Sequence, residues 1–510
     1  MSYQNAIVLQ DLPQLKPVRV PIGEQEILLI RQDDEIKAYQ AKCPHSGAPL
    51  EQGAIRDGYL VCPWHKANFA ISDGSLCEPL ALSDLQRYPV RVENGMVQVD
   101  PEALPPLYQF AEEEDEPVFA ILGTGAAGAA AAWTLRREGF KGRLVLVDRE
   151  QQAPYDRTVL SKFVPSGKMA IDEVPPLLDD DFWHYAERKH GDVEQLDSRE
   201  QLLRFADGST LHYDRLLIAT GGIPQRPDFS GKALFGVHVL RSLEQAATLL
   251  QEVDESSQLV IVGNSFISME LASALRAKKV QVQVIAPDAL PFKKQFGEQI
   301  ARYFRELHEE NGVEFIEGEV AALQGEKGHV SGVELKNGRV VPATAVLLAT
   351  GVAPGTGFIH DLPLNDDGSL TASEELEIAT NVWSAGDIAT WPAASGPMRI
   401  EHWRVAQQQG RVAAKNMLGR GEKFDRVPFF WTAQFGTRYE YLGHAQEWDE
   451  YRLIGSLEEK KFIALYGQQG KLAAVFSCGM YTLTAALVLE MQQPMTMGQA
   501  LAAVESRQQA

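Results

Sequence analysis

The first hundred residues alternate apolar and polar positions, and this period of two predicts short β-strands. Turn-forming pairs, Asp57-Gly58, Asp73-Gly74 and Asn94-Gly95, divide the alternating runs. Residues 1–105 are therefore expected to form a small all-β domain. The expected strands cover residues 5–10, 18–22, 26–32, 36–41, 59–63, 87–93 and 96–100.

Beyond residue 117 the pattern changes to apolar runs that alternate with helical stretches. Strand, turn, helix and strand follow one another from 118 to 148 and again from 258 to 286. This internal repeat predicts a multidomain α/β protein with two dinucleotide-binding domains. The predicted divisions are 118–235 and 356–425 for the two parts of the first domain, 236–355 for the second, and 426–510 for a C-terminal α+β domain.

A short segment, 106–117, separates the β domain from the α/β domains. It contains five consecutive acidic residues, Glu112 to Glu116. Like charges in a row repel one another and do not fold alone. We expect this segment to be an interdomain linker.

Composition and charge narrow the class of protein. The 510 residues are 45% hydrophobic and 23% charged, as in globular chains, and the net charge of −21 argues against nucleic acid or anionic membranes as partners. There is no basic-then-apolar leader and no run of 18 apolar residues, so we expect neither export nor a membrane span. The four cysteines show no disulfide pattern, which favours a reducing compartment, the cytoplasm.

Two short knuckles, Cys43-x-His45 and Cys62-x-x-His65, lie sixteen residues apart, and each offers one thiolate and one imidazole. A Rieske [2Fe–2S] cluster needs two thiolates on one iron and two imidazoles on the other. Structural zinc, the alternative, more often groups its ligands as Cys-x-x-Cys and His-x-His pairs. We expect these four residues to hold a [2Fe–2S] cluster, with the loop amides aimed at the sulfurs.

The stretch CPHSGAPLEQGAIRDGYLVCPWH resembles the Rieske signature, including the Pro-Trp between the second Cys and His. High-potential members of that family have a further cysteine in each knuckle. Ala48 and Trp64 stand there instead, so the site resembles the ferredoxin type. Lys66 follows the second His where many relatives have glycine. We expect a solvated loop lysine at this position, and the alternative is a role in tuning the cluster.

The segment from 118 to 148 carries Gly123-x-Gly125-x-x-Gly128 between a strand and a helix, and its second strand ends in Asp148. Glycines let the backbone approach a pyrophosphate at the helix N-terminus, and the terminal acid binds ribose hydroxyls. This order of elements predicts a dinucleotide site.

PYDRTVLSK (154–162) resembles the corresponding segment of FAD-dependent ferredoxin reductases and apoptosis-inducing-factor-like proteins. The resemblance implies FAD as cofactor, with Arg157 contacting it, Lys162 beside the isoalloxazine, and an ion pair between Lys162 and Glu270. These two residues are the candidate catalytic groups. The resemblance also places further residues at the flavin: Ala219 and Gly221, Gly386 and Asp387 of a second FAD signature, Glu401, Trp403, Phe430 and Trp431. For Phe430 and Trp431, the alternative is that both belong to a plain hydrophobic core.

The second glycine motif is damaged. Gly263 is present, but Ser265 and Ser268 replace the other two glycines, and Ala286 replaces the acid that binds the ribose of NAD. Lys293 and Lys294 follow and are candidates for binding a 2′-phosphate. NADH, NADPH and weakened binding all stay open. The expected NAD(P)H contacts are Gly263, Ser265, Ile267, Glu270 and Gly351.

Together these resemblances identify the chain as a member of the Rieske-bearing apoptosis-inducing-factor-like flavoproteins. They imply an FAD-dependent NAD(P)H oxidoreductase that passes electrons to its own Rieske cluster and on to an acceptor protein, such as an oxygenase or cytochrome. In this reading His45 and His65 are the exit for electrons. The alternative is a flavin-based redox sensor or scaffold with weak NAD(P)H turnover. No cysteine pair follows residue 118, which excludes disulfide-reductase chemistry. We expect a monomer or homodimer.

Overall fold

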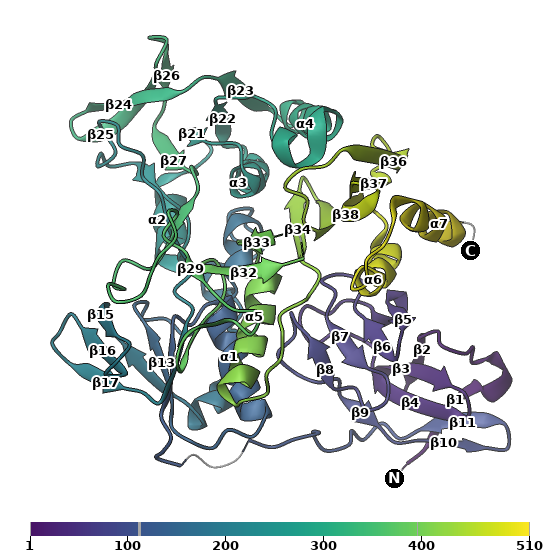
Figure 1. Cartoon of the computed structure of the whole chain (residues 1–510). Coiled ribbons are helices and arrows are strands. Elements are labelled where there is room, and N and C mark those ends of the chain that lie inside the picture. The colour runs from purple at the N-terminus through teal and green to yellow at the C-terminus, as the bar shows by residue number, and fades with distance from the viewer. Residues whose placement is uncertain (1, 111–113, 395, 509–510) are drawn as a thin grey trace.

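The computed structural model describes residues 2–110, 114–394 and 396–508. An all-β domain packs beside two α/β domains, and a C-terminal α+β domain lies between the β domain and the second α/β domain (Figure 1). The fold class expected from the sequence is confirmed. Among the described residues, no helix combines the length and apolar character that crossing a bilayer requires.

The β domain consists of three antiparallel sheets. Asn94 and Gly95 both have positive φ, at 52° and 77°, as the tight turn between two paired strands requires. The strands are β1 (Gln4–Val8), β11 (Met96–Val99) and β10 (Val90–Glu93) in one sheet, β2 (Val18–Ile22), β3 (Gln25–Gln32), β4 (Glu35–Gln40) and β9 (Arg87–Tyr88) in another, and β5 (Ala54–Arg56), β6 (Tyr59–Val61), β7 (Asn68–Ala70) and β8 (Leu76–Glu78) in the third.

The first α/β domain is built on a six-stranded sheet to which the chain returns after a long excursion. Two helices, α1 (Ala126–Arg137) and α5 (Trp403–Met417), lie side by side against it (Figure 1). They approach closely because Gly410 has no side chain: a Cβ there would lie 2.1 Å from the Ala127 carbonyl oxygen. In spatial order the strands are β14 (Glu187–His190), β13 (Leu144–Asp148), β12 (Phe119–Leu122), β18 (Arg215–Ile218), β31 (Val382–Ser384) and β30 (Glu377–Ala379).

The second α/β domain repeats this plan with a five-stranded parallel sheet. In both domains a glycine turn packs on an Ala-Thr-Gly segment: a Cβ on Gly123 would lie 2.3 Å from the Ala219 oxygen, and one on Gly263 2.5 Å from the Ala349 oxygen. The strands are β20 (Val237–His238), β27 (Ala345–Leu348), β21 (Gln258–Val262), β22 (Gln281–Ala286) and β23 (Val313–Glu317), and the helices are α2 (Leu243–Glu252), α3 (Phe266–Arg276) and α4 (Lys293–Glu310).

The C-terminal domain is an antiparallel sheet followed by two helices. Helix α6 (Tyr481–Glu490) packs against β5 of the β domain, and α7 (Met497–Gln508) packs on the sheet. The strands are β34 (Phe429–Gln434), β35 (Thr437–Gly443), β38 (Lys471–Cys478), β37 (Lys461–Gln468) and β36 (Glu450–Ser456).

Short hairpins and ribbons, antiparallel except for the parallel pair β29 and β32, flank the sheets of the α/β domains. They comprise β15 (Val193–Asp197), β16 (Leu202–Phe205) and β17 (Thr210–His212), then β19 (Gly222–Pro224) with β28 (Val352–Pro354), β24 (Val320–Glu326), β25 (His329–Leu335) and β26 (Val340–Pro342), and finally β29 (Leu370–Thr371), β32 (Ala389–Ala393) and β33 (Gly396–Met398).

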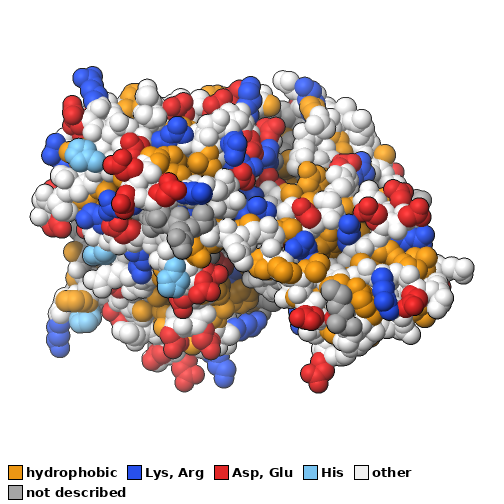
Figure 2. All heavy atoms as spheres, turned by 90° about the horizontal axis from the view of Figure 1, so that it is seen from below, with side chains coloured by type: hydrophobic (Ala, Val, Ile, Leu, Met, Phe, Trp, Pro, Cys, Tyr) orange, Lys and Arg blue, Asp and Glu red, His pale blue; other side chains and the backbone are white. Residues whose placement is uncertain are grey.

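The segment between the β domain and β12 is held against the first α/β domain. Tyr108 and Phe110 pack edge-on against Trp133 and Phe182, with ring centroids 6.0 Å and 5.8 Å apart. Part of the acidic run Glu112–Glu116 lies outside the described residues. Seen from below, the molecule mixes acidic and basic side chains over its surface, with hydrophobic side chains between the two lobes (Figure 2).

Candidate functional site

The two knuckles have the same local fold. The first follows β4 and the second joins β6 to β7, and in each the cysteine N–H donates to a carbonyl five residues later, Cys43 to Ala48 and Cys62 to Ala67, both at 2.8 Å. Both thiols are buried, and amides of the following residues donate to the sulfurs, as the loop sequence predicts. Thiolates so solvated can bind iron without contact with water.

The four ligand side chains form two pairs. The Cys43 and Cys62 thiols are hydrogen-bonded to each other, and the Nδ1 atoms of His45 and His65 are 3.0 Å apart. A Rieske cluster takes two thiolates on one iron and two imidazoles on the other. The two pairs of side chains therefore fit a [2Fe–2S] cluster.

Metal binding needs thiolates and neutral imidazoles, and here the two thiols differ: the hydrogen bond shared with Cys62, together with burial, raises the pKa of Cys43 well above its usual range. Burial raises the pKa of Cys62, but the hydrogen bond from Cys43 and two backbone amides outweigh it and lower that pKa to about 7. Burial holds the pKa of His65 well below its usual range, so its imidazole is neutral.

Lys66 corrects the expectation of a solvated loop lysine. Its side chain is fully buried, and its ammonium donates to both carboxylate oxygens of Glu440 on β35, at 3.0 and 3.1 Å, and to the Pro63 oxygen at 2.6 Å. The backbone has φ of +61°, where glycine is favoured. Burial outweighs the attraction of Glu440 and lowers the pKa of Lys66 to about 8. Lys66 thus joins the β domain to the C-terminal domain.

A second buried charge cluster fixes the same interface. Burial raises the pKa of Glu78, but Arg404 and Arg426 outweigh it and hold it below the ordinary value. Arg426 Nε lies 2.6 Å from the carboxylate, and Gln408 Nε2 donates to it at the same distance. Arg404 on α5 also donates to the Lys66 carbonyl at 2.9 Å. These contacts hold the knuckles against the flavoprotein part.

The two histidines lie on the side of the β domain that faces the flavoprotein part, whereas an exit for electrons was expected to face the surface. His65 is 7% exposed, and its ring lies 4.9 Å from that of Trp431 on β34. His45 is half-buried and lines the same cavity. The His side of the cluster site therefore faces the flavoprotein, because the buried charges dock the β domain with its knuckles turned to the C-terminal domain.

A cavity of about 870 Å³ surrounds the first glycine motif. Gly128 is required for packing, since a Cβ there would lie 1.9 Å from the Gly123 oxygen. A Cβ on Gly125 would meet nothing within 4 Å and would project into the space that a pyrophosphate occupies at the start of α1. The cavity therefore fits the dinucleotide part of FAD.

Asp148 faces this cavity and also braces the glycine turn. One carboxylate oxygen accepts from the backbone N–H and hydroxyl of Thr124, at 2.8 and 2.5 Å, and the other accepts from the N–H of Glu150 at 2.9 Å. A carboxylate has about four acceptor positions, so one is left for a ribose hydroxyl. Arg157 lines the same cavity and pairs with Glu150 at 2.6 Å. Sequence analysis missed Thr124 and Glu150, although both flank predicted residues.

The second FAD signature closes the cavity from the opposite side. Asp387 pairs with Arg241 Nη2 at 2.6 Å, and the Gly386 N–H donates to Gln409 at 2.8 Å. Arg241 gave no signal in the sequence; it lies at the junction before α2 and meets Asp387 through the fold alone. The expected residues that line this cavity are Ala219, Gly221, Gly386, Asp387, Glu401 and Trp403.

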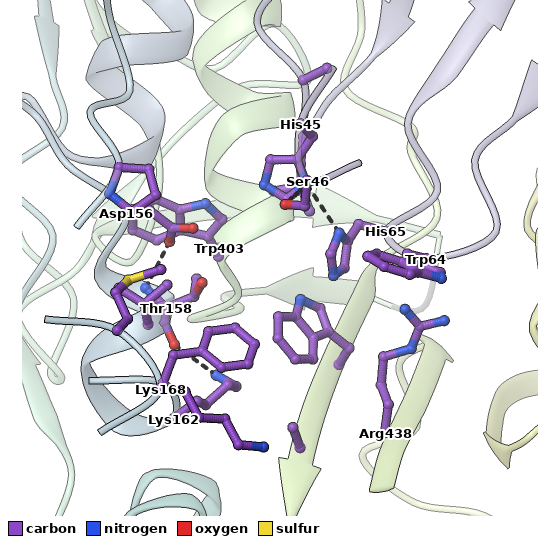
Figure 3. Close-up of a pocket in the computed structure, with 18 of the residues that line it drawn as sticks. His45, Ser46, Trp64, His65, Asp156, Thr158, Lys162, Lys168, Trp403 and Arg438 are labelled. Carbon is purple, nitrogen blue, oxygen red and sulfur yellow. Dashed lines mark hydrogen bonds between the residues drawn. The ribbon is translucent and has the colours of Figure 1, made fainter. Parts of the chain in front are cut away.

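A larger cavity of about 1370 Å³ joins the flavin region to the knuckles. Trp403 lies on one side of it and His65 with Trp64 on the other (Figure 3). Lys162 Nζ is 2.9 Å from Glu270 Oε2, the expected ion pair, and is 4.8 Å from the centre of the Trp431 ring. Ser161, missed by sequence analysis, donates its hydroxyl proton to Glu270 at 2.5 Å.

The two candidate aromatic residues on β34 separate in role. Trp431 lines the larger cavity between Lys162 and His65. Phe430 packs edge-on against Phe266 at 4.4 Å and joins the hydrophobic core around α3. The core alternative therefore applies to Phe430.

The second glycine motif keeps its turn despite the two serines. Gly263 has φ of +106°, and Ser265 and Ser268 Oγ atoms are 3.2 Å apart at the start of α3. Ser265 and Ile267 are exposed, so they form an open surface; Gly263 and Gly351 line neither large cavity. Beyond Ala286, Lys293 pairs with Asp288 at 3.2 Å, while Lys294 is exposed.

Comparison with known proteins identifies the two parts of the chain. The chain matches the model of the Rieske [2Fe-2S] domain over residues 3–89 and that of the pyridine nucleotide-disulphide oxidoreductases over residues 118–410. Apoptosis-inducing factor 3 of Homo sapiens is 32% identical over 493 residues, 92% of this chain and 80% of that protein. The ferredoxin–NAD(+) reductase component of the biphenyl dioxygenase system of Paraburkholderia xenovorans (strain LB400) is 32% identical and covers 68% of this chain and 86% of its own length.

Solved structures show the same architecture. The ferredoxin reductase for the CYP199A2 system from Rhodopseudomonas palustris has a TM-score of 0.67 and 26% identity, covering 71% of this chain and 91% of its own. The covalent putidaredoxin reductase–putidaredoxin complex has a TM-score of 0.69 at 22% identity over 74% of this chain and 93% of that one, which shows the fold. Cys478 is the single cysteine after residue 118, so this chain has no redox-active dithiol there. The chain belongs to the pyridine nucleotide-disulphide oxidoreductase family, as an FAD-dependent NAD(P)H oxidoreductase that also carries a Rieske [2Fe–2S] domain.

Proposed function

We propose that the chain passes electrons from NAD(P)H through FAD to its own Rieske cluster and on to an acceptor protein, such as an oxygenase or a cytochrome. When bound, FAD accepts a hydride from the nicotinamide and releases its electrons singly. Relatives named as ferredoxin–NAD(+) reductase components of dioxygenase systems suggest this direction of flow. In this chain the Rieske domain takes the part of the ferredoxin.

One observation carries the proposal: Trp431 contacts both redox sites. Its ring lies 4.8 Å from the Lys162 ammonium on the flavin side and 4.9 Å from the His65 ring on the cluster side. The buried ion pairs of Lys66 and Glu78 hold the two sides in this position. A fixed arrangement makes the internal transfer independent of diffusion, as in other tethered pairs.

The polar residues orient the cofactor and shape its electrostatics. Lys162 and Glu270 form a nearly buried pair whose positive end faces the cavity wall beside Trp431. Arg157 and Arg241 line the dinucleotide cavity and bring positive charge to the region of the phosphates. Asp387 is placed to accept a hydrogen bond from a hydroxyl group of the ribityl chain, and this bond would replace its contact with Arg241.

We propose that electrons leave the cluster for the acceptor protein at the exposed tip of the first knuckle, which follows His45. Ser46 and Gly47 are exposed, and a Cβ on Gly47 would meet nothing within 4 Å, so a partner can approach the backbone closely there. The sequence shows no disulfide pattern among its four cysteines, and we propose a reducing, cytoplasmic setting on that ground. We keep monomer or homodimer as the expected state.

Stopped-flow spectroscopy tests the route. The holoenzyme is mixed with NADH or NADPH, and bleaching of the flavin and of the cluster is followed separately. We expect Trp431→Leu to slow cluster reduction at least tenfold while flavin bleaching keeps its rate. Phe430→Leu, a matched change one residue away in the core, should alter neither rate. A wild-type flavin that bleaches while the cluster stays oxidised would instead support the redox-sensor alternative.

A further inference from the structure

The second knuckle is bordered by two cations, one of which comes from another domain. Lys66 directly follows the ligand His65, and its ammonium donates to the Pro63 carbonyl oxygen inside the knuckle at 2.6 Å. Arg438, on β35 of the C-terminal domain, donates to the same oxygen at 3.4 Å. Two positive charges therefore contact one carbonyl group between Cys62 and His65.

Both cations are shielded from water. The Lys66 side chain is fully buried, and that of Arg438 is 14% exposed. The Arg438 guanidinium lies 5.7 Å from the centre of the Trp64 ring, beside the knuckle (Figure 3). Charges held away from water act through a lower effective dielectric constant than surface charges do, so their influence on a neighbouring redox centre is larger.

Glu440 holds the two cations together. Its carboxylate accepts from the Lys66 ammonium at 3.0 and 3.1 Å, and it lies 3.1 Å from Arg438 Nη2. The Thr484 hydroxyl donates to the same carboxylate at 2.5 Å. Because one carboxylate is shared between two cations, this group of three keeps one positive charge in excess.

The sign of that excess charge matters for a Rieske cluster. Two thiolates and two neutral imidazoles leave the oxidised cluster neutral overall, and reduction gives it one negative charge. A positive charge nearby stabilises the reduced form and so raises the reduction potential. Water admitted by a loosened interface also favours the charged, reduced form. Loss of a cation therefore lowers the potential, whereas loss of docking raises it.

We propose that the docked C-terminal domain sets the reduction potential of the cluster, with Lys66 and Arg438 raising it and Glu440 limiting the rise. In this step the cluster gains one electron from its reductant, and no bond is made or broken. The effect on the potential needs only the cluster. Its consequence rests on the proposed function, because a higher potential makes transfer from the flavin to the cluster more favourable.

A redox titration tests the two cations without NAD(P)H. The holoenzyme, loaded with FAD and cluster, is reduced stepwise with dithionite and mediators at neutral pH, and the electron paramagnetic resonance signal of the reduced cluster is followed. We expect Lys66→Met to lower the ratio of reduced to oxidised cluster at a fixed potential about tenfold, which is ~59 mV for a one-electron couple. Arg438→Met should lower it by a similar factor, and it covers the case in which Lys66→Met does not fold.

Two variants separate charge from packing. Arg438→Lys keeps the positive charge and should keep the wild-type ratio. The double variant Lys66→Met/Glu440→Leu removes one charge of each sign, so it should return the ratio to within about twofold of wild type.

Arg426→Met is the matched control for the interface. Arg426 also pairs with a buried carboxylate, Glu78 at 2.6 Å, but its other ionic contacts are with Glu422 and Asp425 and not with the second knuckle. Its loss should change the ratio by less than about twofold.

The outcomes separate this proposal from the electron route. A ratio within about twofold of wild type in both Lys66→Met and Arg438→Met, or a rise in either, would overturn the proposal. An equal fall in Arg438→Lys and Arg438→Met would also overturn it, because the first variant keeps the charge. The expected shifts in a protein whose cluster NADH and NADPH never reduce would overturn the electron route alone.

Discussion

The buried pair of Lys66 and Glu440 gives the sharpest test of how the β domain is held. At 3.0 Å and an effective dielectric constant of about 20, their attraction is roughly 5 kcal/mol before desolvation is subtracted. Removing one partner of a buried pair typically costs about 3–5 kcal/mol, because the other charge is left unpaired. After Lys66→Met, Arg438 still lies 3.1 Å from Glu440 and Thr484 still donates to it. We therefore expect a loss near the lower end, about 3 kcal/mol.

Hydrogen exchange measures this loss where it occurs. A change of about 3 kcal/mol in the free energy of local opening speeds exchange roughly 150-fold, so peptides covering 59–70 and 438–442 should both exchange faster. The double variant Lys66→Met/Glu440→Leu should recover most of the protection, since an apolar pair can replace a buried ionic one. Arg19→Met is the control: Arg19 and Glu26 are 3.1 Å apart but nearly half exposed, so the change should be under about 1 kcal/mol. Exchange within threefold of wild type in Lys66→Met would refute the reasoning.

Three further predictions follow from the cavities and the buried side chains. Gly125→Val should leave the urea midpoint of the apoprotein unchanged but prevent the protein from retaining FAD on a desalting column. Gly128→Ala should instead lower the urea midpoint, because its Cβ would meet the Gly123 oxygen. Equal effects of the two changes would contradict this prediction. Glu270→Gln should slow flavin bleaching by NADH roughly tenfold in stopped flow, since it leaves Lys162 without its counter-ion in a nearly buried site, and an unchanged rate would separate the pair from hydride transfer. Burial holds the pKa of His308 in the folded chain below the value near 6.5 that it has in the unfolded chain, so below pH 6.5 the unfolded chain binds the extra proton. The free energy of unfolding should therefore fall by up to about 1.4 kcal/mol for each pH unit below 6.5. In urea titrations His308→Gln should show a shallower fall between pH 6.5 and 5, and identical slopes would contradict the assignment.

Much of the fold could be predicted because its signals are local. The period-two runs and the primed turn at Asn94-Gly95 specify hairpins by themselves, and the strand-glycine-helix order specifies both nucleotide-binding domains. The strands missed in the β domain, β5, β7 and β8, have three residues each. A run so short shows no period, and its pairing is decided by the knuckle that it supports.

In the candidate site, too, residues with local signals could be predicted and residues that depend on domain docking could not. Cys43, His45, Cys62 and His65 could be found from spacing, since each knuckle is a single loop. Lys66 was misjudged because its partner lies 374 residues away and is reached only when two domains dock. Arg241, which the sequence analysis did not single out, meets Asp387 across 146 residues for the same reason. The direction in which His45 and His65 point is also set by the docking of the β domain.

The burial of the interface ion pairs has a consequence for how the protein responds to ionic strength. Salt screens exposed charges over about 10 Å at roughly 0.1 M, so an encounter between a separate reductase and its ferredoxin slows as salt is added. Lys66 and Glu440 are both fully buried, and dissolved ions cannot reach them. On the proposed route, the internal step would keep its rate from dilute buffer to concentrated salt, and only delivery to the outside acceptor would change.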